Sequence, residues 1–185
     1  MSFTNLWPLT SGLCYAVNSF ISLFREHEDA LVVAWVDEVY AERRTDLPAL
    51  LSYRQLVDSV PEVLEELARM LDERATGREI AEAARNLRAH AQVRFQQGCL
   101  IDEVARELML LRRVLTDFLW REGVRVMEGD LWELRDAVRR TDAFLDELIA
   151  QAIVVYAASM RPPVRTRTPV WPPARTRRAS PAGER

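Results

Sequence analysis

The sequence predicts an all-α protein, a single bundle of about six helices that includes a long C-terminal helix. Apolar residues make up 49% of the 185 residues, charged residues make up 29%, and only six residues are glycine. This balance is typical of helical globular proteins rather than of sheet sandwiches. Apolar residues also recur at helical spacing almost without a break before residue 161. The length suits one core, so we expect one domain with an appended segment.

The first half of the chain shows three helical segments. Helical spacing extends from about Ser11 to Arg44 and places Leu31, Trp35 and Val39 on one face. Shorter helices are expected at about residues 48–58 and 61–75, because a proline near the start of each falls in the first turn, where proline is tolerated. We assign residues 1–24 to an N-terminal helical segment, 25–160 to the domain itself and 161–185 to a tail.

Two helices joined at Gly98 carry polar side chains on their apolar faces. At about 100° per residue, His90 and Arg94 fall in the apolar arc of the first helix, and Arg112 falls in that of the second, with Glu107 on its border. A short connection makes the helices antiparallel, and His90 and Glu107 are each about eight residues from the turn. Because an unpaired buried charge costs several kcal/mol, we predict a hydrogen-bonded cluster of these four residues.

This predicted cluster has two interpretations. It is either a satisfied structural network that fixes the register of the two helices, or the lining of a pocket for a small anionic or polar signal. A histidine beside a carboxylate can also titrate in the physiological range, although one such residue is weak evidence for a pH switch.

The last helix is expected at about residues 129–160, opening at Asp130. Its apolar residues alternate steps of three and four for more than three heptads. We predict that this face takes part in a homodimer interface, and the alternative is that it only completes its own bundle. The predicted interface residues are Leu131, Leu134, Val138, Leu145, Leu148, Ala152 and Val155.

The motifs of enzymes and metal proteins are missing from the sequence. It has two histidines, no repeated Glu-x-x-His pair, no phosphate-binding glycine loop and no nucleophile elbow. Cys14 and Cys99 have no CxxC partner, which fits a reducing, cytoplasmic location. No stretch approaches the roughly 20 apolar residues that a membrane span needs. We therefore expect a non-catalytic protein without metal, cofactor or membrane contact.

Charge divides the chain at residue 160. Residues 1–160 carry 18 arginines and 27 acidic residues, whereas residues 161–185 carry seven arginines and one glutamate. The tail is also rich in proline and lacks apolar periodicity, so we expect it to be disordered. Seven arginines around Trp171 suggest an alternative function, in which the tail binds nucleic acid or an acidic partner. The simpler alternative is that the basic tail folds back on the acidic body or is a solvated terminus.

The segment around Gly98 resembles a known family. His90-Ala91, Arg94 and Gly98 are followed by Glu107 and by Leu111-Arg112-Arg113. This order of residues resembles the N-terminal domain of RsbRD-type stressosome co-antagonists, which also precedes some sensor histidine kinases. The segments LFREHEDALVVAWVDEV, which contains Trp35, and FLDELIAQAIVVYA resemble the opening and closing helices of that domain. The resemblance spans about residues 20–157.

The resemblance implies a globin-like sensory domain that lacks haem, dimerises and passes a signal to an output domain. No sulfate-transporter-like or kinase domain follows residue 160, so we expect the output to come from another protein or from the tail. Leu108 stands where an aromatic residue is common in the family, and Cys99 where a tyrosine is common. The likeness to globins also keeps a haem- or small-ligand-binding alternative open, with His90 as the plausible axial ligand.

Overall fold

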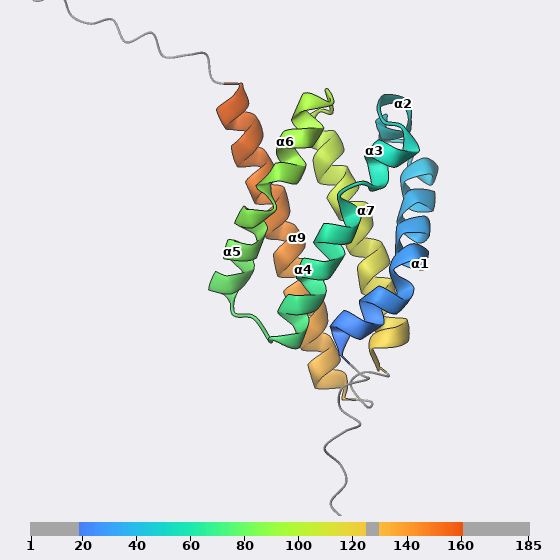
Figure 1. Ribbon diagram of the computed structural model, residues 1–185, viewed down its shortest axis with the longest axis vertical. Helices are drawn as coiled ribbons and strands as arrows, with labels where there is room; N and C mark the ends of the chain where they lie inside the picture. Colours follow the sequence, from blue (N-terminus) through green and yellow to red (C-terminus); the bar gives the residue numbers. More distant parts are fainter. Residues whose placement is uncertain (1–18, 125–129, 161–185) are drawn as a thin grey trace, which may run out of the picture.

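The protein is a bundle of helices, as the sequence predicts (Figure 1). The computed structural model describes residues 19–124 and 130–160, and these ranges contain no strand. None of the helices in these ranges has the length and apolar character that crossing a bilayer requires. The elements are α1 (Phe20–Ala41), α2 (Leu47–Leu50), α3 (Tyr53–Val57), α4 (Val60–Asp72), α5 (Gly77–Asn86), α6 (Arg88–Gln96), α7 (Ile101–Phe118), the π-helix η1 (Leu119–Gly123) and α9 (Leu131–Ser159).

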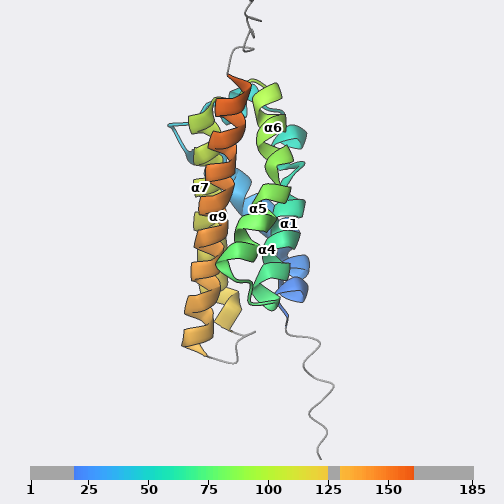
Figure 2. The ribbon, with the colours of Figure 1, turned by 90° about the vertical axis from the view of Figure 1, so that its left-hand side faces the viewer.

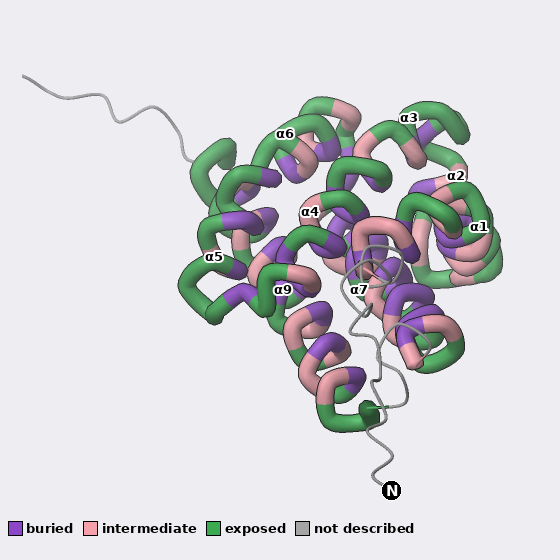
Figure 3. The backbone as a smooth tube through the Cα atoms, turned by 60° about the horizontal axis from the view of Figure 1, so that its bottom comes forward, coloured by how far each residue is buried: buried purple, intermediate pink, exposed green. Residues whose placement is uncertain are grey.

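The longer helices run roughly along one axis of the molecule (Figures 1 and 2). Helix α9 packs against α4, α5, α6 and α7, while α1 packs against α4 and α7. The buried faces of the helices turn toward one another and the exposed faces turn outward (Figure 3). The largest fully buried aromatic side chains are Trp35 in α1 and Phe144 in α9. One core therefore joins elements from both ends of the chain.

Several helix ends follow the local signals of the sequence. Asp130 caps α9, because its carboxylate accepts hydrogen bonds from the backbone N–H groups of Trp132 at 2.8 Å and Glu133 at 3.2 Å. Pro48 and Pro61 lie in the first turns of α2 and α4. Gly98 has a φ of +84°, the left-handed conformation that glycine adopts most readily. These are the positions at which the sequence predicts a helix to begin or end.

Other boundaries differ from the sequence prediction. The segment expected at 48–58 is two short helices, because Ser52 and Gln55 form a capping box that starts α3. The helix expected before Gly98 is interrupted at Leu87, which separates α5 from α6. Helix α7 continues into the π-helix η1, which the apolar pattern does not indicate. The predicted start near Ser11 lies outside the described residues, and the predicted boundary between residues 24 and 25 lies within α1.

The start of α1 is fixed by a residue far along the chain. The backbone N–H groups of Phe20 and Ile21 donate to the two carboxylate oxygens of Asp72, at 2.7 and 3.0 Å. Ser19 adds a local cap by accepting from the N–H of Ser22 at 3.2 Å. The last residue of α4 thus supplies acceptors for the otherwise unpaired donors at the first turn of α1. This contact joins α1 and α4 at one end of the bundle.

Candidate functional site

A buried ion pair joins α6 to α7. The side chains of Arg94 and Glu107 are 1% and 2% exposed. Arg94 Nε donates to Glu107 Oε2 at 2.9 Å, and Arg94 Nη2 donates to Glu107 Oε1 at 2.6 Å. The two parallel bonds form the bidentate arrangement that arginine and carboxylate groups favour. The pair lies between antiparallel helices on the two sides of Gly98, as the apolar arcs predict.

The remaining donors of Arg94 attach this pair to α3. Arg94 Nη1 donates to the backbone carbonyl of Gln55 at 2.8 Å and to Oε1 of Gln97 at 3.0 Å. Arg94 Nη2 also donates to the carbonyl of Leu56 at 2.8 Å. From the other side, Trp35 Nε1 donates to the backbone carbonyl of Glu107 at 3.3 Å. The buried charges are therefore held by hydrogen bonds from several elements, which offsets the cost of removing them from water.

His90 lies at the edge of the same cluster. Its side chain is 10% exposed, and its Nε2 is 3.7 Å from Oε2 of Glu107 without a hydrogen-bond partner. Its Nδ1 is 2.6 Å from the hydroxyl oxygen of Ser59. Burial raises the pKa of Glu107, but His90 and Arg94 outweigh that effect, so the pKa lies below its ordinary value of 4.5. Glu107 is therefore held in its ionised form.

Arg112 does not join this cluster, contrary to the sequence prediction. It forms an ion pair with Asp146 of α9, and its Nε is 3.9 Å from Oδ1 of Asp142. Its side chain is 27% exposed. Although Arg112 falls within the apolar arc of α7, its long side chain reaches the acidic residues of α9 and stays partly exposed. The structure brings together three of the four predicted residues and places the fourth elsewhere.

The sequence did not indicate the acceptors that complete the cluster. Arg94 has five N–H donors and one carboxylate partner, so further acceptors were required, but nothing local identifies the carbonyls of α3. Tyr156 was likewise missed as a polar contact. It donates a hydrogen bond of 2.8 Å to the carbonyl of Cys99, next to Gly98. Burial raises the pKa of the Tyr156 hydroxyl to about 12, so Tyr156 remains a donor.

The geometry of the cluster favours a structural role over ligand binding. Both ring nitrogens of His90 face other side chains, so a haem iron could reach neither without displacing Ser59 or Glu107. Within residues 19–124 and 130–160, no group of three or more His, Cys, Asp or Glu side chains is placed to hold a metal ion. The bidentate pair and its backbone acceptors instead fix the rotation of α6 relative to α7 and α3.

Most of the predicted interface stripe of α9 is buried in the chain's own core. Leu134, Leu145, Leu148 and Ala152 are at most 5% exposed. A second subunit cannot contact these four side chains while the bundle is intact. Leu131 is 62% exposed, and Val138 and Val155 are half-buried. Of the predicted stripe, only Leu131, Val138 and Val155 are therefore accessible to a second subunit.

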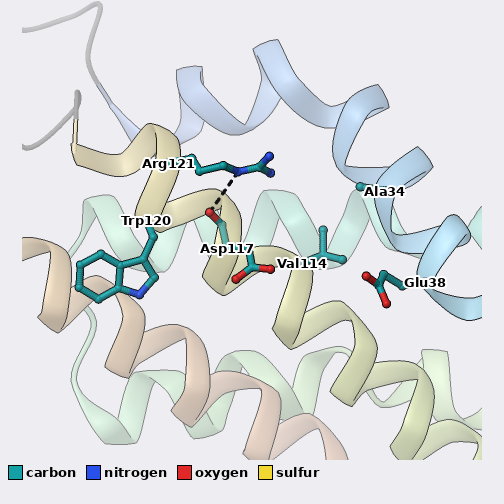
Figure 4. A pocket seen from close by; sticks show the side chains of 6 residues that line it. All are labelled: Ala34, Glu38, Val114, Asp117, Trp120 and Arg121. Atoms are coloured by element: carbon teal, nitrogen blue, oxygen red, sulfur yellow. Dashed lines mark hydrogen bonds between the residues drawn. The ribbon is translucent and has the colours of Figure 1, made fainter.

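The surface has a cavity of about 380 Å³ between α1, α7 and η1 (Figure 4). It is lined by Ala34, Glu38, Val114, Asp117, Trp120 and Arg121. Arg121 reaches from η1 toward α1, and its Nε donates to the backbone carbonyl of Asp117 at 3.3 Å. The volume lies in the range of small-ligand pockets. However, Glu38 is already paired with Arg113, and the lining favours no single ligand chemistry.

Comparison with known proteins identifies one family. Residues 29–168 match the model of the RsbT co-antagonist protein rsbRD N-terminal domain. No curated protein and no solved structure matches this chain. The family match covers Trp35 and every residue of the buried cluster.

Proposed function

Because the chain belongs to the RsbT co-antagonist protein rsbRD N-terminal domain family, we propose that it is a non-catalytic input domain that works by dimerising and by binding a signalling partner. The observation that carries this proposal is the family match over most of the chain. The cluster supports the proposal, because His90, Arg94 and Glu107 belong to the segment that resembles the family. Their contacts join α6 and α7 and connect them to α3. The cytoplasmic location expected from the sequence belongs to the same proposal.

In this proposal the buried cluster is the rigid part of the domain and α9 is the part that transmits a signal. The cluster joins α1, α3, α6 and α7 through Trp35, Arg94 and Glu107. Helix α9 packs on four other helices and is the longest element described. A change in how those helices pack would therefore shift α9 and the residues that follow it.

We place the contact with a second copy on the outer seam of α7 and α9. The Arg112–Asp146 ion pair fixes which sides of these two helices adjoin. On that side, Met109 is 54% exposed, Ile153 is 52% exposed and Ile149 is half-buried. We call Met109, Ile149 and Ile153 the seam patch. Exposed apolar side chains such as Met109 and Ile153 are typical of interaction surfaces.

Native mass spectrometry of the full chain tests this proposal, because one spectrum reports subunit number and retained ligand together. We expect a dimer of bare chain mass. A monomer at every concentration that captures no signalling protein in pull-down experiments would contradict the proposal. A mass excess that disappears on unfolding would instead support the ligand-binding alternative.

A further inference from the structure

A surface groove of about 350 Å³ lies between α1 and α4. Its floor is apolar and includes the buried side chains of Phe24, Leu64 and Ala68. Pro61 is exposed and Ile21 is half-buried along the same groove. The groove is separate from the Arg94–Glu107 cluster and from the seam patch. The helices that form it are fixed to each other by the Asp72 cap on α1.

The rim of this groove is acidic. Four carboxylates line it, against the single guanidinium of Arg25; they belong to Glu28, Asp58, Glu62 and Glu65. Arg25 Nη2 is 3.6 Å from Glu65 Oε1, and both side chains are at least 70% exposed. Exposed ion pairs of this kind contribute little, so the rim keeps its negative character. The groove thus combines an apolar floor with several acceptors for cationic donors.

We propose that residues 161–185 of the same chain, the basic tail, dock in this groove. The tail carries seven arginines and one glutamate, and its sequence also supplies Trp171 and several prolines. Arginine donors match the rim carboxylates, and the indole and proline rings match the apolar floor. This proposal goes beyond the proposed function, because it concerns a contact within the chain and not the family's signalling partner.

The tail is long enough to reach the groove. Helix α9 has 29 residues, so it spans about 43 Å at roughly 1.5 Å per residue. The 25 residues of the tail reach about 78 Å when extended at roughly 3.1 Å per residue. The tail follows α9 in the sequence, and the groove is lined by residues of α1 and α4 and by Asp58 between α3 and α4. The extended tail is therefore considerably longer than α9, the longest helix described.

Residues 1–18 are the competing occupant, because they precede α1 directly. They contain apolar residues but no charged side chain, so their side chains offer the rim carboxylates only neutral donors, which form weaker hydrogen bonds with a carboxylate than a guanidinium does. Charge complementarity therefore favours the tail. Docking would link the face of α1 and α4 to the segment that follows α9, so a partner that binds either one would affect the other.

Limited proteolysis of the full chain tests the proposal. Trypsin cleaves after arginine, and a docked tail is cleaved only while it is released. We compare the wild type with a rim variant, Glu62→Arg/Glu65→Arg, and with a matched control, Asp37→Arg/Glu82→Arg, which changes the net charge equally at exposed sites outside the groove. We expect cleavage within residues 161–185 to be roughly fivefold or more faster in the rim variant, with the control at the wild-type rate. Added salt should accelerate cleavage of the wild type.

Three outcomes would overturn the proposal. Equal cleavage rates in all three proteins would show that the rim does not hold the tail. Protection that grows with protein concentration would place the tail on a second copy instead. The groove would belong to residues 1–18 if chymotrypsin failed to cleave at Phe3, Trp7 and Tyr15 while the tail remained open to cleavage. Circular dichroism of each variant verifies that the bundle is folded.

Discussion

At the scale of single residues, Arg94 shows how a charged side chain can belong in a core. Its five donors meet Glu107, Gln97 and two backbone carbonyls, so almost all of its hydrogen-bonding capacity is used. A buried pair of this kind need not stabilise the fold more than apolar residues would. However, removal of one partner leaves the other charge buried and unpaired, which is strongly destabilising. Any packing of the helices that separates Arg94 from Glu107 is therefore strongly destabilised.

We predict that Glu107→Gln lowers the free energy of unfolding by about 3 kcal/mol, because it leaves the Arg94 charge without its counterion. Asp146→Asn is the matched control. It removes the charge that pairs with Arg112, but Asp146 is 67% exposed. We expect that control to change stability by less than about 1 kcal/mol. Urea unfolding followed by circular dichroism measures both variants, and equal losses would contradict the assigned burial.

The Arg94–Glu107 ion pair should also make the stability of the protein depend on pH. The pKa of Glu107 in the folded protein lies below its ordinary value of 4.5, so its stabilising contribution is complete above that value. It is lost as the pH falls toward the lowered pKa, because the unfolded chain then binds the proton first. We expect the stability difference between wild type and Glu107→Gln to shrink as the pH falls through the range below about 4.5. A constant difference across that range would argue against a lowered pKa.

At the scale of elements, the turn between α6 and α7 determines where the cluster forms. Gly98 has a positive φ, and the N–H of Cys99 donates to the carbonyl of Arg94 at 3.0 Å. Tyr156 of α9 holds the same turn through the carbonyl of Cys99. The turn reverses the chain so that His90 and Glu107, which are about equally distant from it, lie side by side.

We predict that Gly98→Ala destabilises the protein by about 1–2 kcal/mol, because the left-handed conformation is unfavourable for a residue with a Cβ atom. The expected cost comes from the backbone alone, since a Cβ at Gly98 would meet no atom within 4 Å. Gly77→Ala is the control, because Gly77 has equal space and no positive φ. Thermal unfolding should show a lower midpoint only for Gly98→Ala. A loss of the same size at Gly77 would show that conformation is not the cause.

At the scale of the whole molecule, burial within the bundle decides which surfaces remain available to partners. The core uses most of the apolar stripe of α9, including Leu134, Leu145 and Ala152. Two side chains of the proposed seam patch, Met109 of α7 and Ile153 of α9, remain exposed. The groove between α1 and α4 is a second surface, and its main feature is the acidic rim.

We predict that Ile153→Asp shifts the protein from dimer to monomer, because it buries a charge at the proposed contact between copies. Val33→Asp on α1 is the matched control, since Val33 is 53% exposed and lies outside the seam patch. Light scattering after size-exclusion chromatography measures the mass of each protein. The proposed location of the interface is wrong if the Ile153→Asp variant remains dimeric or if both variants dissociate equally.

The sequence alone was enough to predict the helical class, the helix start at Asp130 and the closeness of His90, Arg94 and Glu107. These features depend on residues near one another in the chain: a cap at Asp130, a left-handed turn at Gly98 and the rotation of about 100° per residue. The family match agrees with the resemblance that the same residues carry.

The groups that complete the cluster, and the neighbour that covers each helix face, follow from tertiary packing. The carbonyls of α3 that accept from Arg94 lie 38 and 39 residues away, and Arg112 turns to Asp146, 34 residues away. The burial of the α9 stripe likewise depends on four other helices. A helical pattern identifies an apolar face but not its neighbour, because the neighbour is determined by how the whole bundle packs.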